Sequence, residues 1–146
     1  MTSLRIEQPA DDAALQDWRR IHNEIIPTHL LSADDVRERS GRNHLHVGYL
    51  GDAAVGCTTV RPPADGSSTA VVIARVLPHQ RRQGLGTQLY GFALQRAREL
   101  GAGTIETVVL ATNEDGLTFA HKHGFTEFDR YVLPGDTIPY IELRLA

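Results

Sequence analysis

The 146-residue sequence has a single cysteine, Cys57, and no apolar run long enough to cross a membrane. One cysteine cannot form an internal disulfide, which favours a reducing compartment. A membrane helix needs about 20 consecutive apolar residues, and residues 1–7 lack the apolar core of a signal peptide. We therefore expect a cytoplasmic protein without a membrane partner.

An excess of basic residues is also missing, since 15 Lys and Arg stand against 18 Asp and Glu, for a net charge of -3. Nucleic-acid binding usually requires a basic stripe or a strongly basic domain, so no nucleic-acid partner is expected. The hydrophobic content of 41% and charged content of 23% are ordinary for a globular protein. Disorder, collagen and coiled coil are excluded, and residues 1–146 fit one compact domain.

Seven segments are predicted to be strands because their residues alternate in polarity or form short β-branched runs. These segments are residues 4–8, 44–50, 53–60, 69–77, 104–110, 126–133 and 138–145. The second and third strands are joined by Gly51 and Asp52, which predict a tight hairpin.

Four helices are expected between these strands. Apolar residues recur at helical spacing between residues 14 and 25, and Ser32 can cap a second helix. Further helices are predicted over residues 87–100 and 114–123, each followed by glycine. The order β, α, α, β, β, β, α, β, α, β, β predicts a mixed sheet with helices on both faces.

The loop after the fourth predicted strand has the composition of a phosphate-binding cradle. Gly84 and Gly86 have no side chains to block an anion, and the following helix adds the positive end of its dipole. Arg81 and Arg82 are predicted to supply mobile cationic groups, and the Thr87 hydroxyl can donate a hydrogen bond. The loop has neither the Gly-Lys-Ser/Thr of nucleoside triphosphatases nor the three glycines of dinucleotide folds. The alternative interpretation is a glycine-rich turn that only starts a helix.

Two patterns in this half of the chain resemble landmarks of the GNAT superfamily of acyl-CoA N-acyltransferases. The first is Arg-x-x-Gly-x-Gly at residues 81–86, after a strand that ends at Val76. The second is Asn113 followed by a helix that closes in Gly-Phe at residues 124–125. The resemblance implies an α/β (α+β) fold with a mixed, mostly antiparallel seven-stranded sheet, splayed between the fourth and fifth strands. The pantetheine arm of coenzyme A lies in that gap.

The resemblance also implies a set of residues that bind acetyl-CoA or coenzyme A. The backbone at Val76 would contact the pantetheine arm, and Asn113 would lie on the cofactor side of the fifth strand. For Asn113, capping of the fourth helix is an equally good interpretation. The pyrophosphate would be held by Arg81, Arg82, Gln83, Gly84, Leu85, Gly86 and Thr87.

The family's mechanism is direct attack of a neutral amine on the thioester, with one group to remove a proton and one to protonate the thiolate. The usual tyrosine acid is replaced by Ala120. Tyr131 is the predicted substitute, and Tyr140 is the other candidate. A strand tyrosine can equally be a packing residue.

The usual carboxylate on the fourth strand is missing too, because residues 69–74 contain no acid. Glu24 is the predicted base, with a solvated helix-end carboxylate as the alternative. Glu106 could serve as well, or form a structural ion pair. Glu24 would also favour a cationic acceptor by simple attraction.

His44 and His46 lie two residues apart on one predicted strand and share a face, but no third ligand accompanies them. No metal site is expected, and Cys57 is expected to be a small buried side chain.

The function implied is transfer of acetyl from acetyl-CoA to a primary amine of a small molecule or peptide. The alternatives are an acyl-CoA-binding module without catalysis, and an enzyme with another acyl donor or a hydroxyl acceptor. Pairing of exposed edge strands leaves a homodimer open.

Overall fold

The computed structural model describes residues 3–81 and 83–145, so the predicted cofactor residue Arg82 lies outside the described residues. The elements follow the predicted order. The strands are β1 (Leu4–Glu7), β2 (His44–Leu50), β3 (Ala53–Arg61), β4 (Thr69–Val76), β5 (Thr104–Leu110), β6 (Phe125–Tyr131) and β7 (Tyr140–Leu145). The helices are α1 (Asp12–Ile25), α2 (Ala33–Arg42), α3 (Leu85–Glu99) and α4 (Glu114–Lys122), with a short 3-10 turn, η1 (Pro78–Gln80), before α3.

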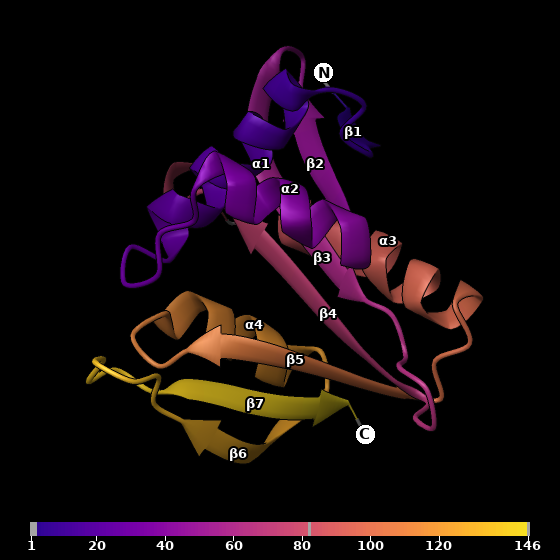
Figure 1. The fold of residues 1–146 in the computed structure, drawn as a ribbon, viewed down its shortest axis with the longest axis vertical. Coiled ribbons are helices and arrows are strands. Elements are labelled where there is room, and N and C mark those ends of the chain that lie inside the picture. The colour runs from indigo at the N-terminus through magenta and orange to yellow at the C-terminus, as the bar shows by residue number, and fades with distance from the viewer. Residues whose placement is uncertain (1–2, 82, 146) are drawn as a thin grey trace.

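The strands form one sheet in the order β1-β2-β3-β4-β5-β7-β6, and β4 with β5 is its parallel pair. This confirms the predicted mixed, mostly antiparallel sheet. The register of β4 with β5 covers only Thr69 to Val71 against Thr104 to Glu106. Beyond these residues the two strands diverge, as Figure 1 shows, so the predicted splay is present.

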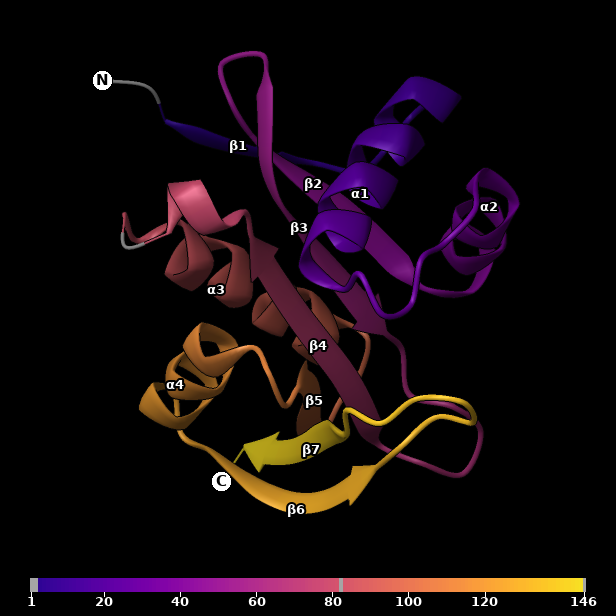
Figure 2. The same cartoon turned by 90° about the vertical axis from the view of Figure 1, so that its left-hand side faces the viewer.

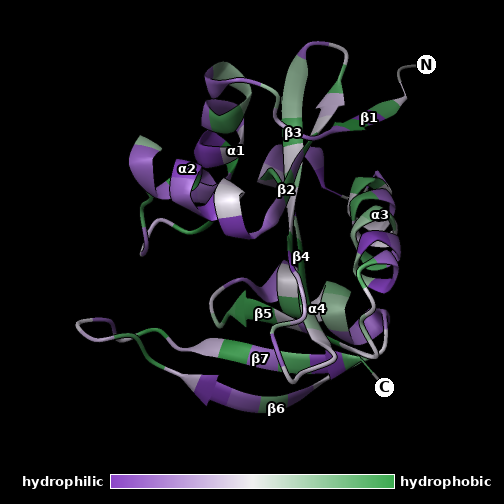
Figure 3. Ribbon diagram, turned by 45° about the vertical axis from the view of Figure 1, so that its right-hand side comes forward, coloured by the Kyte–Doolittle hydropathy of each residue, from purple (hydrophilic) through white to green (hydrophobic). Residues whose placement is uncertain are grey.

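Helices cover both faces of the sheet (Figures 2 and 3). On one face α1 and α2 bury Trp18 and Val36 against Val47 and Cys57. On the other face α3 and α4 share a core that includes Ala93 and Ala120 together with residues of β4, β5 and β7. The two faces therefore have separate cores, and the splay between β4 and β5 lies between them.

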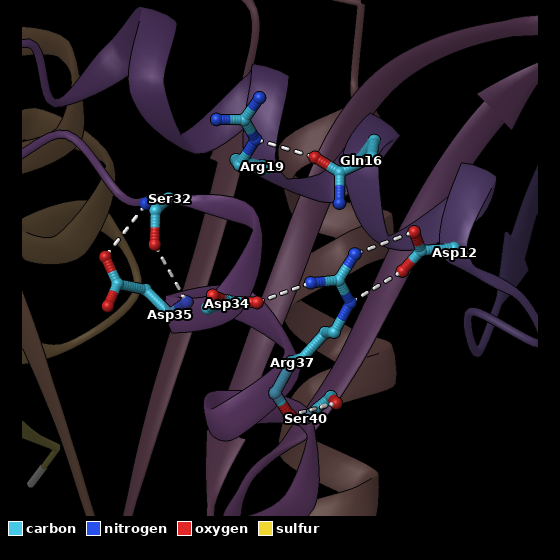
Figure 4. A network of polar contacts seen from close by, with 8 residues as sticks. All are labelled: Asp12, Gln16, Arg19, Ser32, Asp34, Asp35, Arg37 and Ser40. Atoms are coloured by element: carbon cyan, nitrogen blue, oxygen red, sulfur yellow. Dashed lines mark hydrogen bonds and ion pairs between the residues drawn. The ribbon is translucent and has the colours of Figure 1, made fainter.

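The junction of α1 and α2 is held by polar contacts near the start of each helix (Figure 4). Ser32 and Asp35 form a reciprocal capping box at the N-terminus of α2, as the Ser32 cap predicts. Arg37 reaches Asp12 on α1 at 2.9 Å and Asp34 at 2.6 Å. These ion pairs are exposed and contribute little stability, but they link the start of α1 to α2.

Several element boundaries differ from the predictions by one or two residues, and two of these differences have a clear physical reason. The last strand begins at Tyr140 and not at residue 138, because Pro139 has no N–H for a ladder. The third helix begins at Leu85 and not at residue 87, because Gly84 serves as its N-cap. No helix in the described part of the chain is both long and apolar enough to cross a membrane.

Two buried histidines make the stability of this fold depend on pH. Burial and, to a lesser degree, the nearby Arg75 cation lower the pKa of His22 to about 4. Burial and, to a lesser degree, the Arg96 cation lower the pKa of His46 to about 4. In the unfolded chain both titrate near 6.5. Below that pH only the unfolded state gains protons, so stability falls between pH 6.5 and 4.

We therefore expect the free energy of unfolding to drop by about 2 kcal/mol per histidine, or about 4 kcal/mol in total, between pH 7.5 and pH 5. Urea denaturation followed by circular dichroism at both pH values measures this change. Equal unfolding free energies at the two pH values would contradict the burial of neutral imidazoles at His22 and His46.

Candidate active site

A cavity of about 580 Å³ opens where β4 and β5 diverge. Its two sides belong to the two faces of the sheet. The α3 side is formed by the start of α3 and by α4, and includes Gly84, Gly86, Asn113 and Phe119. The α1 side is formed by Ile25 and Ile26 at the end of α1, Ile73 and Arg75 on β4, Leu110 on β5 and Tyr140 on β7.

The α3 side contains a helix N-terminus suited to an anion. Gly84 has a φ of 79°, a left-handed conformation that glycine adopts without strain. No side chain of the described residues caps this end of α3. The first backbone N–H groups of α3 are therefore open to a ligand at the positive end of the helix dipole.

Arg81 is held in place by contacts at both ends of the cavity's α3 side. Its Nε donates to the Val76 carbonyl at 2.9 Å, and its Nη1 lies 3.1 Å from Asp115 in the first turn of α4. The guanidinium thus ties together β4, the loop and α4. Arg81 is a fixed cation beside the helix N-terminus, where the sequence predicted a mobile one.

The backbone of β4 faces the gap at Val76. The Leu77 N–H donates to the Val55 carbonyl on β3, whereas the Val76 carbonyl accepts from Arg81 on the other edge. Because a strand residue's N–H and C=O point to the same edge, the Val76 N–H also faces the β5 side. A hydrogen-bond donor is therefore available at the residue predicted to contact pantetheine.

Asn113 caps α4, since its side-chain oxygen accepts from the Gly116 N–H at 3.0 Å. It also lines the cavity. The structure thus shows the capping role, and the cofactor role stays a prediction on a residue that is correctly placed for it.

The predicted cofactor residues divide into two groups. Those that line the cavity are Val76, Arg81, Gly84, Gly86, Thr87 and Asn113. Leu85 is instead buried in the core beside Leu89. Gln83 is exposed and bonds Gln80 at 3.3 Å. Both can contribute through their backbone groups alone.

The predicted catalytic residues do not line the cavity. Glu24 is exposed at the end of α1, and Tyr131 is 40% exposed on β6. Tyr131 stacks on Tyr140, with ring centroids 5.5 Å apart, and Tyr140 is the tyrosine of this pair that lines the cavity. The Glu106 carboxylate forms an ion pair with Arg144 at 2.7 Å.

Other candidate chemistry is accounted for by packing. Burial raises the pKa of the Cys57 thiol to about 11, which confirms a small buried side chain. His46 packs edge-on against Phe92 with ring centroids 4.7 Å apart. Among the described residues no three His, Cys, Asp or Glu side chains are grouped to hold a metal ion.

The sequence matches the acetyltransferase (GNAT) family over residues 11–125. The chain belongs to this family. The GNAT family binds acetyl-CoA as its donor. None of the curated proteins matches the sequence.

Solved structures of GNAT acetyltransferases share the fold at low sequence identity. One, assigned as a phosphinothricin N-acetyltransferase, is 22% identical with a TM-score of 0.79 and 98% of each chain covered. The yncA acetyltransferase of Salmonella typhimurium, solved with acetyl-CoA, is 19% identical with a TM-score of 0.77, covering 97% of this chain and 92% of its own. The ribosomal-protein-S18-alanine N-acetyltransferase of Escherichia coli is 17% identical with a TM-score of 0.77, covering 98% and 93%.

Sequence analysis missed Arg75 as a cavity residue. The signal was present, because Arg75 is the one charged residue in a strand that is otherwise apolar or hydroxylated, residues 69–76. A charged side chain inside a central strand needs a partner or a function.

Proposed function

We propose that this protein is an acetyl-CoA-dependent N-acetyltransferase that acts on a primary amine. The observation that carries the proposal is the N-terminus of α3, which no side chain of the described residues caps and which opens beside the β4–β5 cavity in a chain of the GNAT family. A helix end suited to an anion, beside a cavity of about 580 Å³ between β4 and β5, supports a donor with a pyrophosphate and an extended arm.

The residues fit this donor in three places. The N–H groups at residues 85–87 and the fixed Arg81 cation would hold the pyrophosphate. The Val76 N–H would bond the pantetheine arm or the thioester oxygen. Asn113, which keeps its side-chain N–H₂ while its oxygen caps α4, would add one donor.

Acetyl-CoA supplies a thioester, an activated acyl group with a good leaving group. The neutral amine nitrogen forms a bond to the carbonyl carbon, the carbon–sulfur bond breaks, and the thiolate gains a proton. The α1 side of the cavity offers Tyr140 as a proton donor within reach of the gap. No carboxylate of the described residues lines that side, so we assign the amine proton to water that enters the cavity.

Calorimetric titration with acetyl-CoA, and in parallel with ATP and NAD, tests the proposal. We expect saturable binding of acetyl-CoA alone. A thiol-release assay with a panel of amines then tests turnover. Failure to bind acetyl-CoA would overturn the proposal, whereas tight binding without turnover of any acceptor would favour the alternative, a binding module that has lost catalysis with the tyrosine replaced by Ala120.

The pair Tyr131 and Tyr140 provides a direct comparison of proton donors. Tyr140→Phe is expected to lower kcat by about tenfold, at the low end for general acids because a thiolate leaves readily. Tyr131→Phe, which changes a half-exposed ring outside the cavity, is expected to change kcat less than about twofold. If Tyr131→Phe is the variant that loses activity, the sequence prediction stands and the assignment to Tyr140 is wrong.

A further inference from the structure

The α1 side of the cavity is apolar apart from two side chains, Arg75 and Tyr140. Arg75 pairs in register with Cys57, which places its side chain on the face covered by α1. It is partly buried and lines the cavity. A guanidinium keeps its charge in a protein, so this wall carries a permanent cation.

No carboxylate of the described residues neutralises Arg75. It takes part in none of the ion pairs formed among them within 4.0 Å. Burial lowers the pKa of the guanidinium, and the groups that raise it are the Cys57 thiol and the Tyr140 phenol, neither of which is a carboxylate. A partly buried cation without a counter-ion is costly unless a ligand supplies the anion.

Two further arginines add to the positive field on this face. Burial and the neighbouring cations, Arg75 and Arg61 among them, lower the pKa of Arg39 on α2. Within the described part of the chain, neither Arg39 nor Arg61 forms an ion pair. A protein with a net charge of -3 thus places three arginines on the face of the sheet that forms the α1 side of its cavity, and Arg75 is the one that lines the cavity.

The acidic groups of this face are placed elsewhere. Glu106 is ion-paired with Arg144. Glu142 shares the face of β7 with Tyr140, but it does not line the cavity and does not affect the pKa of Arg75. Asp35 belongs to the capping box of α2. None of these carboxylates replaces a ligand at Arg75.

We propose that the acceptor is a small amine that also carries a carboxylate or a similar anionic group, and that Arg75 binds this group on the α1 side of the cavity. This inference rests on the proposed N-acetyltransferase function. The surrounding wall of Ile25, Ile26, Ile73 and Leu110 favours an apolar substituent on the same molecule. An α-amino acid with an aliphatic side chain has all three features.

The opposite class of acceptor, suggested by Glu24, is disfavoured. Glu24 is exposed and outside the cavity, whereas Arg75 is inside it. Polyamines and lysine-rich peptides would bring further positive charge towards Arg39, Arg61 and Arg75, and like charges repel most strongly where water is excluded.

The first test uses the unaltered protein with three acceptors that differ in one group and with one polyamine. L-leucine is compared with L-leucinamide, with the α-aminophosphonate of the same side chain, and with spermidine, in a thiol-release assay at saturating acetyl-CoA. We expect kcat/KM for L-leucine to exceed that for L-leucinamide by about tenfold or more. The amide's amino group is the weaker base and so is more often neutral, which means that amine reactivity alone would give the opposite order. The phosphonate arm shows whether the site requires a carboxylate or accepts other anions.

The second test changes the cation. Arg75→Met is expected to raise KM for L-leucine by about tenfold or more and to leave KM for L-leucinamide within about twofold. Arg75→Lys should restore part of the affinity, because it restores charge without the guanidinium fork. Arg98→Met, an exposed arginine on α3 outside the cavity, is the matched control. Unchanged acetyl-CoA affinity and melting temperature show that Arg75→Met is folded.

The outcomes separate this inference from the proposed function. If acetyl-CoA does not bind, the proposed function fails. If acetyl-CoA binds but kcat/KM for L-leucinamide or spermidine equals that for the anionic acceptors, the inference alone is wrong. If no acceptor turns over, calorimetric titration of the coenzyme A complex decides, since a complex that binds neither L-leucine nor its phosphonate overturns the role of Arg75.

Discussion

Gly84→Val is expected to weaken acetyl-CoA binding by about 100-fold or more, equivalent to about 2.7 kcal/mol. Gly84 has a φ of 79°, and a β-branched residue in this region is strained by about 1–3 kcal/mol. The loop relieves that strain by moving, which misplaces the N–H groups of residues 85–87. A Cβ at Gly84 would meet nothing within 4 Å, so the added side chain occupies the space open to the pyrophosphate.

Two other variants separate the causes. Gly91 lies on the same helix and does not line the cavity, and a Cβ added there would meet nothing within 4 Å. Gly91→Ala should therefore leave acetyl-CoA affinity unchanged. Gly84→Asn tolerates the left-handed conformation but still adds a side chain. If Gly84→Asn binds acetyl-CoA normally, backbone strain is the main cause of the affinity loss in Gly84→Val. If Gly84→Asn binds acetyl-CoA as weakly as Gly84→Val does, occlusion of the pyrophosphate site is the main cause. A folded Gly84→Val protein with wild-type affinity would show that the helix end does not hold the pyrophosphate.

Local sequence signals predicted the secondary structure because each element contains its own start or stop. Ser32 caps α2, and the alternating residues of β2 and β7 predicted these two strands, although both faces of β2 are buried in the folded chain. The boundary at Tyr140 was missed although Pro139 was visible, since a proline limits a strand only once the ladder partner is known. The splay came from the family resemblance, because divergence of β4 from β5 has no local residue pattern.

Most of the α3 side of the site could be predicted from the sequence because residues 76–87 form one continuous segment that lines it. The α1 side could not, since Ile26, Arg75 and Tyr140 are brought together only by the sheet order. Arg81 was predicted as a free cation for the same reason. Its partner Asp115 is 34 residues away in the sequence. Contacts between distant segments thus decide which of the predicted side chains face the cavity.

The integrity of the α1 side depends on the core beneath it, and Trp18→Ala is expected to lower the free energy of unfolding by about 3–5 kcal/mol. Trp18 is fully buried among residues of β2, β3 and α2, and its Nε1 donates to the Thr58 carbonyl at 3.1 Å. Alanine would leave a large cavity and an unpaired carbonyl. Since whole domains are stable by only about 5–15 kcal/mol, much of the total would be lost.

Trp18→Phe separates packing from hydrogen bonding. Phenylalanine keeps most of the apolar volume but not the donor, so a smaller loss of about 1–3 kcal/mol is expected. Unfolding is followed in urea by circular dichroism, because Trp18 is the only tryptophan and its fluorescence is lost in both variants.

Trp18 also stacks on His22, with ring centroids 5.5 Å apart, and His22 lies close enough to Arg75 for the guanidinium charge to lower its pKa. In Trp18→Phe, which is expected to stay folded, KM for an anionic acceptor should therefore change more than KM for acetyl-CoA, because α1 and β4 wall the acceptor end while α3 and α4 wall the donor end. Equal changes in the two constants would show that the two sides of the cavity are not mechanically separate.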